Sequence, residues 1–375
     1  MHPIQMVDLK QQYHAIKSEI DAAVLNVLES TAFINGPQVQ GFAASLAQYL
    51  NVKHVIPCAN GTDALQITLM ALGLQPGDEV ITPSFTFIAT AEVIALLGLI
   101  PVFIDVDPQT FCIDTSLLEA AITPKTKAIV PVHLFGQAAN MEDIVAIAAR
   151  HHLYVVEDNA QAIGCNYYCA DGSVKKAGTF GIAGTTSFFP SKNLGAYGDA
   201  GAIITNDDEL AEKLRMVANH GQSKRYYHDV VGCNSRLDTI QAAILEVKLK
   251  YLDQYIKARQ DVADYYNDAF KNHSKITIPY RAAYCNHVFH QYTILLNGVD
   301  REGLIAYLAA HKIPSMIYYP VPAHKQKMFS LFDLSSINLP VTDNLSERVL
   351  SLPIHTEMSR EQLELITTKV LEFTT

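Results

Sequence analysis

The clearest chemical signal in the sequence lies in residues 184–201, which read GTTSFFPSKNLGAYGDAG. Lys192 follows an apolar stretch there and stands among small and hydroxyl-bearing residues such as Ser187. A lysine amine condenses with an aldehyde, and removal from water favours its neutral, nucleophilic form. Small residues also let the backbone approach a phosphate. We therefore interpret Lys192 as a candidate Schiff-base lysine, although a lone lysine is more often a surface residue.

A second segment, residues 58–65 (CANGTDAL), has the pattern of a strand that turns into a helix. The first N–H groups of a helix have no intrahelical acceptor and bind anions, so this turn is a candidate anion cradle to which Thr62 can add its hydroxyl. Asp63 is suited to capping the helix. An ordinary capped helix is the alternative, because the chain contains neither a G-x-x-x-x-G-K-[ST] loop nor a G-x-G-x-x-G turn.

A third segment, residues 154–162 (YVVEDNAQA), ends an apolar run with Glu157 and Asp158. Carboxylates at the carboxyl end of a parallel strand face the usual ligand crevice. A carboxylate in that position can hold a protonated ring nitrogen and so make a pyridine an electron sink. Capping of a helix is the other ordinary role for Asp158.

The pattern around these segments predicts an α/β fold. From residue 52 to residue 206, short apolar runs alternate with helical patterns, which is typical of βα units around a mainly parallel sheet. Helices with apolar residues three and four apart are expected as well. The expected strands are residues 55–57, 79–82, 101–104, 128–132, 153–157, 185–189 and 202–205, and the expected helices are residues 61–72, 87–97, 141–152 and 209–219.

The second part of the chain predicts a smaller α/β unit. Residues 238–270 have the pattern of one long helix or of a bent pair. Residues 292–296, 301–311 and the helical tail 360–373 indicate the smaller unit beyond it. We therefore expect a large domain over residues 1–245 and a small C-terminal domain over residues 246–375.

Composition and charge exclude several classes of protein. The 375 residues include 28 Lys and Arg against 38 Asp and Glu, and the resulting charge of −10 repels a polyanion, so no nucleic-acid partner is expected. With 49% hydrophobic and 18% charged residues, the chain is not expected to be disordered. No secretory signal is recognisable, and the longest apolar stretch, residues 93–104, is too short to span a bilayer, so no membrane association is expected.

The sequence does not predict a metal site. The six cysteines are scattered and lack zinc-ligand spacing, which fits reduced thiols in the cytoplasm. Asp105 and Asp107 have no third ligand at a suitable spacing, so strand-end and turn roles are preferred for them. His287 and His290 have the pattern of surface or core histidines.

Taken together, five ordered motifs resemble a known family of enzymes. The motifs NGTDAL, ITPSFTFIATAE, VEDNAQA, SFFPSKNLGAYGDAGAI and NSRLDTIQAAIL are similar to the signatures of the DegT/DnrJ/StrS nucleotide-sugar aminotransferases. The resemblance runs from about Asp8 to Pro353. It implies pyridoxal 5′-phosphate as cofactor, the fold-type I aminotransferase architecture with a large, mainly parallel sheet, and a homodimer whose active sites are shared between subunits.

The resemblance also implies a role for each cofactor-binding residue. Lys192 would hold the cofactor covalently and shuttle the proton of transamination, and Asp158 would pair with the ring nitrogen. The other implied contacts are Gln161 at the phenolic oxygen, Phe87 stacked on the ring, Gly61, Thr62 and Ser187 at the phosphate, and Asn234 reaching the phosphate from the partner subunit.

By the same resemblance, L-glutamate would be the amino donor and a nucleotide-linked keto-sugar the acceptor. The motifs are most similar to the branch that aminates UDP-2-acetamido-2-deoxy-3-oxo-glucuronate for surface polysaccharide or lipopolysaccharide synthesis. Arg236 has the planar fork that suits the uronate carboxylate, although it could equally grip the donor or brace a dimer. Tyr318, Tyr319 and His324 would contact the sugar or the diphosphate. Residues 223–228 (SKRYYH) would extend across the dimer, or else form a solvated loop.

Three other functions stay open. One is a 4-keto-6-deoxy nucleotide-sugar aminotransferase. Another is a keto-sugar dehydratase of the same fold, which has histidine in place of the Schiff-base lysine, so Lys192 argues against it. The third is a catalytically silent regulatory protein on this scaffold, which would lack parts of the cofactor site.

Overall fold

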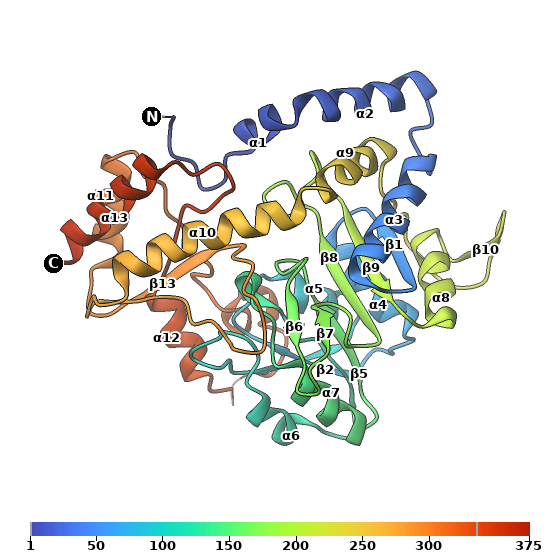
Figure 1. Cartoon of the computed structure of the whole chain (residues 1–375). Helices are drawn as coiled ribbons and strands as arrows, with labels where there is room; N and C mark the ends of the chain where they lie inside the picture. Colours follow the sequence, from blue (N-terminus) through green and yellow to red (C-terminus); the bar gives the residue numbers. More distant parts are fainter. Residues whose placement is uncertain (1, 335–336) are drawn as a thin grey trace.

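The computed structural model describes residues 2–334 and 337–375 and is built on a central seven-stranded sheet (Figure 1). The strands lie in the order β1-β9-β8-β5-β4-β2-β3. Only β9 runs against its neighbours, so the sheet is mainly parallel, as predicted. The strands are β1 (His54–Cys58), β2 (Glu79–Pro83), β3 (Ile100–Ile104), β4 (Thr126–Ile129), β5 (Tyr154–Asp158), β8 (Ala183–Ser187) and β9 (Gly201–Thr205). Each of the seven predicted strands overlaps one of them.

Both faces of this sheet are buried, which explains why its strands are short continuous apolar runs. Neighbouring residues of one strand join different cores, as Val80 and Ile81 of β2 do. One face packs against α4 (Gly61–Ala71), α5 (Ala89–Leu96) and α8 (Asp208–Ala218). The other packs against α3 (Pro37–Leu50), α7 (Met141–Arg150) and α9 (Thr239–Leu249). The four helices predicted in this region are confirmed as α4, α5, α7 and α8.

The C-terminal part of the chain forms a second, smaller core. Residues 238–270 are a pair of helices, α9 and α10 (Leu252–Phe270), which is one of the two predicted forms. A three-stranded antiparallel sheet, β12 (Ile276–Thr277), β13 (Tyr292–Leu296) and β14 (Val349–Leu352), packs with α10, α11 (Arg301–Ala310) and α13 (Arg360–Thr374). The boundary proposed at residue 245 falls inside α9 and stays a prediction.

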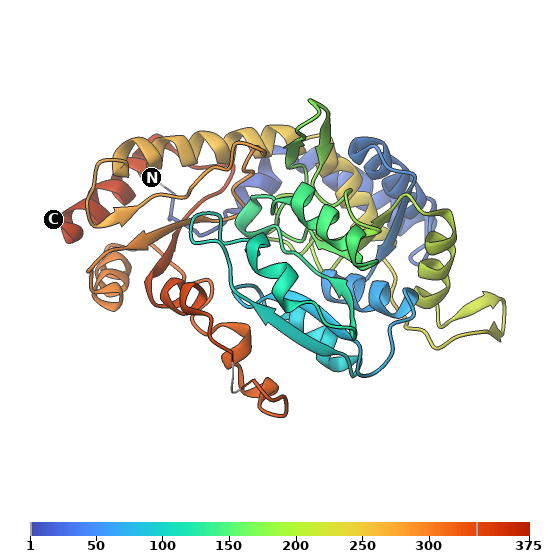
Figure 2. The same ribbon diagram turned by 90° about the horizontal axis from the view of Figure 1, so that it is seen from below.

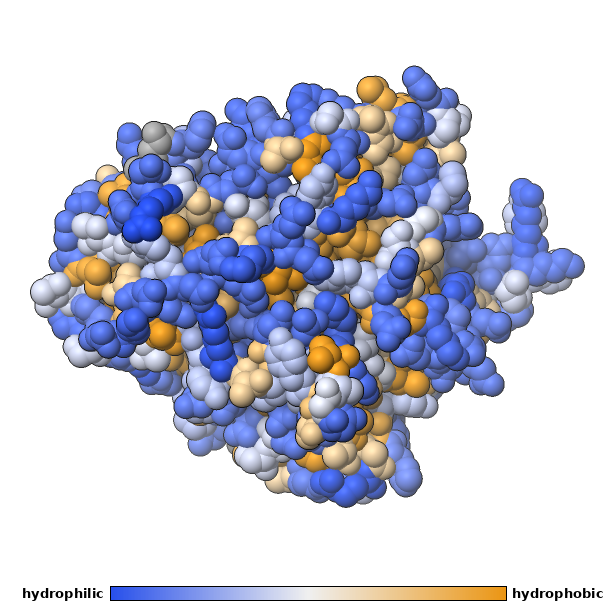
Figure 3. Space-filling view, viewed as in Figure 1, coloured by the Kyte–Doolittle hydropathy of each residue, from blue (hydrophilic) through white to orange (hydrophobic). Residues whose placement is uncertain are grey.

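Several short elements complete the described fold. The β10 and β11 strands form a hairpin that projects from the body of the molecule (Figure 2). Hydrophobic side chains are visible in the upper part of the space-filling view, where α2 lies, and Leu25 and Leu28 of α2 are exposed (Figure 3). These elements are α1 (Leu9–Ala15), α2 (Lys17–Ser30), α6 (Leu118–Ala121), β6 (Asn166–Tyr168), β7 (Val174–Lys176), β10 (Gln222–Lys224), β11 (Tyr227–His228) and α12 (Pro340–Arg348).

The acidic pair Asp105 and Asp107 has structural roles, as predicted. The Asp105 carboxylate accepts hydrogen bonds from the backbone N–H groups of Val341 and Thr342 and from the Thr342 hydroxyl, and so ties the end of β3 to α12. Asp107 accepts from the backbone and hydroxyl of Thr110 in a turn. Within residues 2–334 and 337–375, no group of three or more His, Cys, Asp or Glu side chains is placed to hold a metal ion. No helix in these ranges is long and apolar enough to cross a membrane.

Candidate active site

A cavity of about 830 Å³ opens where the carboxyl ends of the parallel strands meet. It brings together nine of the twelve residues singled out from the sequence: Gly61, Thr62, Phe87, Asp158, Gln161, Ser187, Lys192, Tyr318 and Tyr319. These residues come from segments up to 258 positions apart, and they meet because β1, β2, β5 and β8 all end at this edge. Asn234, Arg236 and His324 do not line this cavity.

Lys192 lies in a tight loop directly after β8. Its backbone N–H donates to the carbonyl of Phe189 (2.8 Å), and the side-chain amide of Asn193 donates to the carbonyl of Val288 (2.9 Å). Burial lowers the pKa of Lys192 to about 8, and the nearby Asp158 carboxylate opposes the shift. An amine with this pKa has a much larger neutral fraction near neutral pH than an ordinary lysine has, and nucleophilic attack on an aldehyde requires the neutral form.

Asp158 ends β5 and is only 6% exposed. One carboxylate oxygen accepts a hydrogen bond from the Thr90 hydroxyl (2.8 Å) and the other accepts from the backbone N–H of Ala160 (3.1 Å). The Asp158 carboxylate is therefore held in place by one hydrogen bond at each of its two oxygens. Thr90, the second residue of α5, was not singled out from the sequence, although it follows Phe87 by only three residues.

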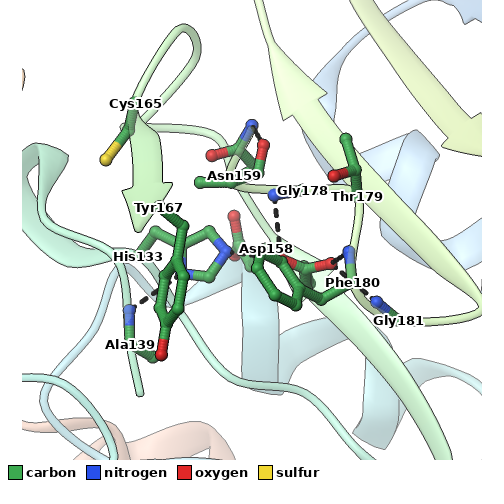
Figure 4. A network of polar contacts seen from close by, with 12 residues as sticks. His133, Ala139, Asp158, Asn159, Cys165, Tyr167, Gly178, Thr179, Phe180 and Gly181 are labelled. Carbon is green, nitrogen blue, oxygen red and sulfur yellow. Dashed lines mark hydrogen bonds and ion pairs between the residues drawn. The ribbon is translucent and has the colours of Figure 1, made fainter. Parts of the chain in front are cut away.

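Behind Asp158, a buried network fixes the end of β5 (Figure 4). Glu157 is fully buried, and its carboxylate accepts from the backbone N–H groups of Gly178, Phe180 and Gly181 at 2.6–2.8 Å. It also accepts from Nε2 of His133 (2.9 Å). Because Nδ1 of His133 accepts from a backbone N–H, the ring proton lies on Nε2, so the imidazole donates to Glu157 without being charged.

The start of α4 has the geometry that suits an anion. The side chain of Asn60 caps the helix by accepting from the N–H of Asp63 (2.8 Å). The first N–H groups, those of Gly61 and Thr62, have no acceptor within the helix. A Cβ at Gly61 would lie 2.7 Å from the Cβ of Ser187, so glycine is needed for the helix to approach the end of β8 this closely. The N–H groups of Gly61 and Thr62 and the hydroxyls of Thr62 and Ser187 thus lie on one side of the cavity.

Aromatic residues form another wall. Phe87 is 53% exposed, and its ring centroid lies 6.2 Å from that of Tyr319. Gln161 donates to the Tyr319 hydroxyl (2.9 Å) and accepts from the backbone N–H of Phe135 (2.8 Å). Burial raises the pKa of Tyr319, which keeps its phenol neutral.

His324 lies beside the cavity and contacts a neighbouring turn. Its Nδ1 is 2.7 Å from the Ser84 hydroxyl, which also accepts from the His324 backbone N–H (3.0 Å). The Asp343 carboxylate lies 3.7 Å from Nε2, which favours the ring proton on that nitrogen and leaves Nδ1 to accept from the hydroxyl. Burial lowers the pKa of His324, which favours the neutral ring that accepts this bond. The histidine therefore holds its own segment against the turn that leads to Phe87.

Asn234 and Arg236 lie together in a separate recess of about 400 Å³. Asp199 lines both this recess and the larger cavity, so the two are neighbours. Arg236 makes no hydrogen bond or ion pair with any residue that the structure describes. Its guanidinium is thus available to a ligand or to a second subunit.

The residues of the cavity fit pyridoxal 5′-phosphate. The lysine of lowered pKa suits its aldehyde, the Asp158 carboxylate suits a protonated ring nitrogen, and the exposed Phe87 ring offers a stacking face. The start of α4 at Gly61 approaches Ser187 so closely that a single Cβ would prevent it, and the free N–H groups and hydroxyls that line the cavity there suit a phosphate. A chain with this sheet order and this lysine–carboxylate pair is a pyridoxal-phosphate-dependent enzyme of fold type I.

Comparison with known proteins gives the family. The model of the DegT/DnrJ/EryC1/StrS aminotransferase family matches residues 14–371, and the chain belongs to this family. Among solved structures, an aminotransferase of the family from Brucella abortus superimposes with a TM-score of 0.94 at 43% identity, covering 99% of each chain. NtdA of Bacillus subtilis, with its bound cofactor PMP, gives a TM-score of 0.88 at 34% identity, covering 95% of this chain and 81% of its own.

Three relatives are similar over almost the whole chain. A protein of Geobacillus stearothermophilus named a pleiotropic regulatory protein is 48% identical, covering 99% of this chain and 98% of its own. The UDP-2-acetamido-2-deoxy-3-oxo-D-glucuronate aminotransferase of Pseudomonas aeruginosa is 47% identical, covering 97% and 98%. The UDP-N-acetyl-3-dehydro-α-D-glucosamine 3-aminotransferase of Acidithiobacillus ferrooxidans is 45% identical, covering 98% and 97%.

Other cavity residues were not singled out from the sequence. Phe189 and Gln291 line the cavity beside Lys192 and Tyr319, as does Ser191, which the sequence had already indicated as a small hydroxyl-bearing residue next to Lys192. His290 also lines it while being only 5% exposed, so the prediction of a core histidine is correct but incomplete. Residues 290–291 come from a segment about 100 residues beyond Lys192, and only the tertiary fold brings it to the site.

The Gly61 cradle yields a first prediction. In Gly61→Ala, the added Cβ pushes the helix start away from Ser187, because it would lie 2.7 Å from that side chain. We expect the affinity for pyridoxal phosphate to fall by about 1–3 kcal/mol, on the order of 10- to 100-fold in Kd, in an absorbance titration. The control is Gly41→Ala within α3, where the nearest atom belongs to the flexible Glu246 side chain at 3.2 Å. An unchanged Kd in Gly61→Ala would contradict the role of the cradle.

The lowered pKa of Lys192 yields a second prediction. The rate at which cofactor-free protein condenses with pyridoxal phosphate rises with pH and levels off above about 8, because only the neutral amine reacts. Since Asp158 holds the pKa up, Asp158→Asn moves the midpoint of the profile lower. Stopped-flow absorbance measures both profiles. A rate that keeps increasing to about pH 10, as for an ordinary lysine, would show that Lys192 is not the reacting group.

Proposed function

We propose that the protein transfers the amino group of L-glutamate to C3 of UDP-2-acetamido-2-deoxy-3-oxo-glucuronate, in the synthesis of surface polysaccharide or lipopolysaccharide. The observation that carries the proposal is the pairing, in one cavity, of a lysine whose pKa is about 8 with an Asp158 carboxylate held by Thr90. The names of the Pseudomonas and Acidithiobacillus relatives support a UDP-linked 3-keto sugar.

Each cavity residue has a definite task in this reaction. Pyridoxal phosphate, when bound, supplies the aldehyde and the electron-accepting ring that carry the amino group between the two substrates. The Lys192 amine would hold it covalently and, once released, would take the proton from the donor's α-carbon and pass it to the carbon of the former aldehyde group. The Asp158 carboxylate keeps the ring nitrogen protonated. Thr90 orients that carboxylate, and Phe87 covers one face of the ring against water.

We propose a homodimer with shared active sites. Asn234 is exposed in a recess next to the cavity, and the β10–β11 hairpin and the apolar residues of α2 extend from the surface. Asn234 of one subunit would bind the phosphate held by the other. The unpaired Arg236 would bind a carboxylate, that of the uronate or that of the donor. We place the protein in the cytoplasm, where reducing conditions keep its six free cysteines as thiols.

Two alternatives remain. One is a 4-keto-6-deoxy sugar: the relatives include enzymes named for other nucleotide sugars, such as a GDP-perosamine synthase of Caulobacter vibrioides, which is 38% identical and covers 91% of each chain. A regulatory role is supported by the name of the Geobacillus relative. We favour catalysis because a silent regulator has no need to keep a buried lysine, its carboxylate partner and a phosphate cradle in one cavity.

The activity itself gives a third prediction. Purified protein with pyridoxal phosphate, L-glutamate and a panel of UDP- and dTDP-linked keto-sugars should aminate the UDP-linked 3-keto uronate, with the new amine at C3 in the NMR spectrum. Lys192→Ala abolishes turnover because both the covalent attachment and the proton carrier are removed. A 4-amino product would establish the alternative sugar, and inactivity on every sugar would favour the regulatory role.

A fourth prediction tests the shared site. Asn234→Ala and Lys192→Ala are each inactive or nearly so, whereas mixed dimers of the two recover about a quarter of the wild-type activity per subunit. One site of each hybrid then has Lys192 from one chain and Asn234 from the other. If Asn234 served its own chain, no hybrid would contain an intact site and mixing would restore nothing.

A further inference from the structure

A buried lysine lies behind the active-site loop and takes no part in the mechanism derived above. Lys248 of α9 is 0% exposed, and its ammonium donates to the carbonyl of Gly195 (2.6 Å) and lies 5.0 Å from the centroid of the Tyr197 ring. It makes no ion pair with any residue that the structure describes. The charged group that acts on it is another cation, Arg259 of α10.

Gly195 closes the loop that contains Lys192. A Cβ at Gly195 would lie 2.2 Å from the carbonyl oxygen of Pro190, so the two ends of the loop are in direct contact. The next residue, Ala196, donates its N–H to the carbonyl of Phe188 (2.8 Å). A group that fixes the Gly195 carbonyl therefore fixes the backbone of Lys192, three residues earlier.

Arg259 binds the backbone segment that lies against the other side of the Lys192 loop. One guanidinium nitrogen, Nη1, donates to the carbonyls of Phe289 (3.1 Å) and His290 (3.2 Å), and His290 lines the cavity. The Asn193 side chain joins the two segments by donating to the Val288 carbonyl. Two buried cations from consecutive helices thus hold the two backbone segments that meet behind Lys192.

Stability alone does not account for Lys248. Burial without an anion lowers its pKa to about 7, because the surroundings disfavour the charged form. Apolar side chains at buried charged positions are often neutral or stabilising. Burying the charge of Lys248 therefore costs folding free energy, and we expect such a residue where the group that it binds, here the Gly195 carbonyl, serves a function.

We propose that Lys248 is a positioning residue for Lys192: by binding the Gly195 carbonyl, it holds the loop that places the Schiff-base lysine in the cavity that Asp158 also lines. The inference rests on the proposed role of Lys192. Lys248 acts only through the loop, since its ammonium reaches a backbone carbonyl and not the cavity.

The test compares Lys248→Met, which is unbranched and one heavy atom shorter than lysine and so removes the ammonium while keeping most of the apolar stem, with Lys250→Met. Lys250 stands two residues away with a side chain that is 64% exposed. In Lys248→Met, the rate of borohydride-trapped labelling of Lys192 by pyridoxal phosphate, mapped by mass spectrometry, falls on the order of 10-fold. The kcat for the first half-reaction with L-glutamate falls on the order of 10- to 100-fold, since small displacements of a reacting group have effects of this size. The KM for L-glutamate and the melting temperature of the cofactor-free protein are unchanged, or the latter is raised.

Lys250→Met behaves as wild type in every measurement. Lys248→Gln, which retains an N–H donor, recovers part of the labelling rate. Wild-type labelling and kcat in Lys248→Met would overturn the inference and leave the proposed function intact. A fall in melting temperature that accompanies the losses and persists in Lys248→Gln would also overturn it, because Lys248 would then be a structural residue. If the wild-type protein is not labelled at Lys192, both the inference and the proposed function fail.

Discussion

The geometry of the active site depends on one fully buried carboxylate, that of Glu157. It receives hydrogen bonds from three backbone N–H groups and from a neutral histidine, His133. Leaving a buried hydrogen-bonding group without its partner costs about 1–3 kcal/mol, and more when the group is charged. The four donors come from the segment after β4 and from the segment before β8, so Glu157 joins the two strands that flank β5. Asp158, the next residue, is held in place by the same connections.

The site also shows how one sheet edge serves several chemical tasks. Parallel strands deliver their carboxyl ends to one edge, where backbone N–H groups and side chains are left without partners. The cradle at Gly61, the carboxylate of Asp158 and the amine of Lys192 follow three different strands of this edge. Loops alone would position these groups less firmly, because they lack the hydrogen bonds that fix each strand to its neighbours.

The polar groups around the cavity divide into two kinds. Those that would meet the cofactor are restrained by partners, as Asp158 is by Thr90 and Gln161 is by Phe135. Arg236 and Asn234, which would meet the sugar or a second subunit, lie in a more open recess, and Arg236 is unpaired among the described residues. The family shares the cofactor and differs in the sugar. The restrained residues would bind the shared cofactor, and the residues in the open recess would bind the sugar that differs from one family member to another.

The sequence by itself determined the sheet, the helices that cover it and the chemical identity of the site. Apolar runs and helical spacing are local properties, so the seven strands and α4, α5, α7 and α8 follow from them. The motifs around Lys192 and Asp158 are likewise local, and they predict a Schiff-base lysine and a carboxylate for a protonated ring nitrogen. Only the tertiary structure decided that Thr90 orients Asp158, that His324 binds Ser84 beside the cavity, and that Lys248 supports the Lys192 loop. These contacts join residues 53 to 240 positions apart, and no local pattern records them because they depend on how strands and helices pack.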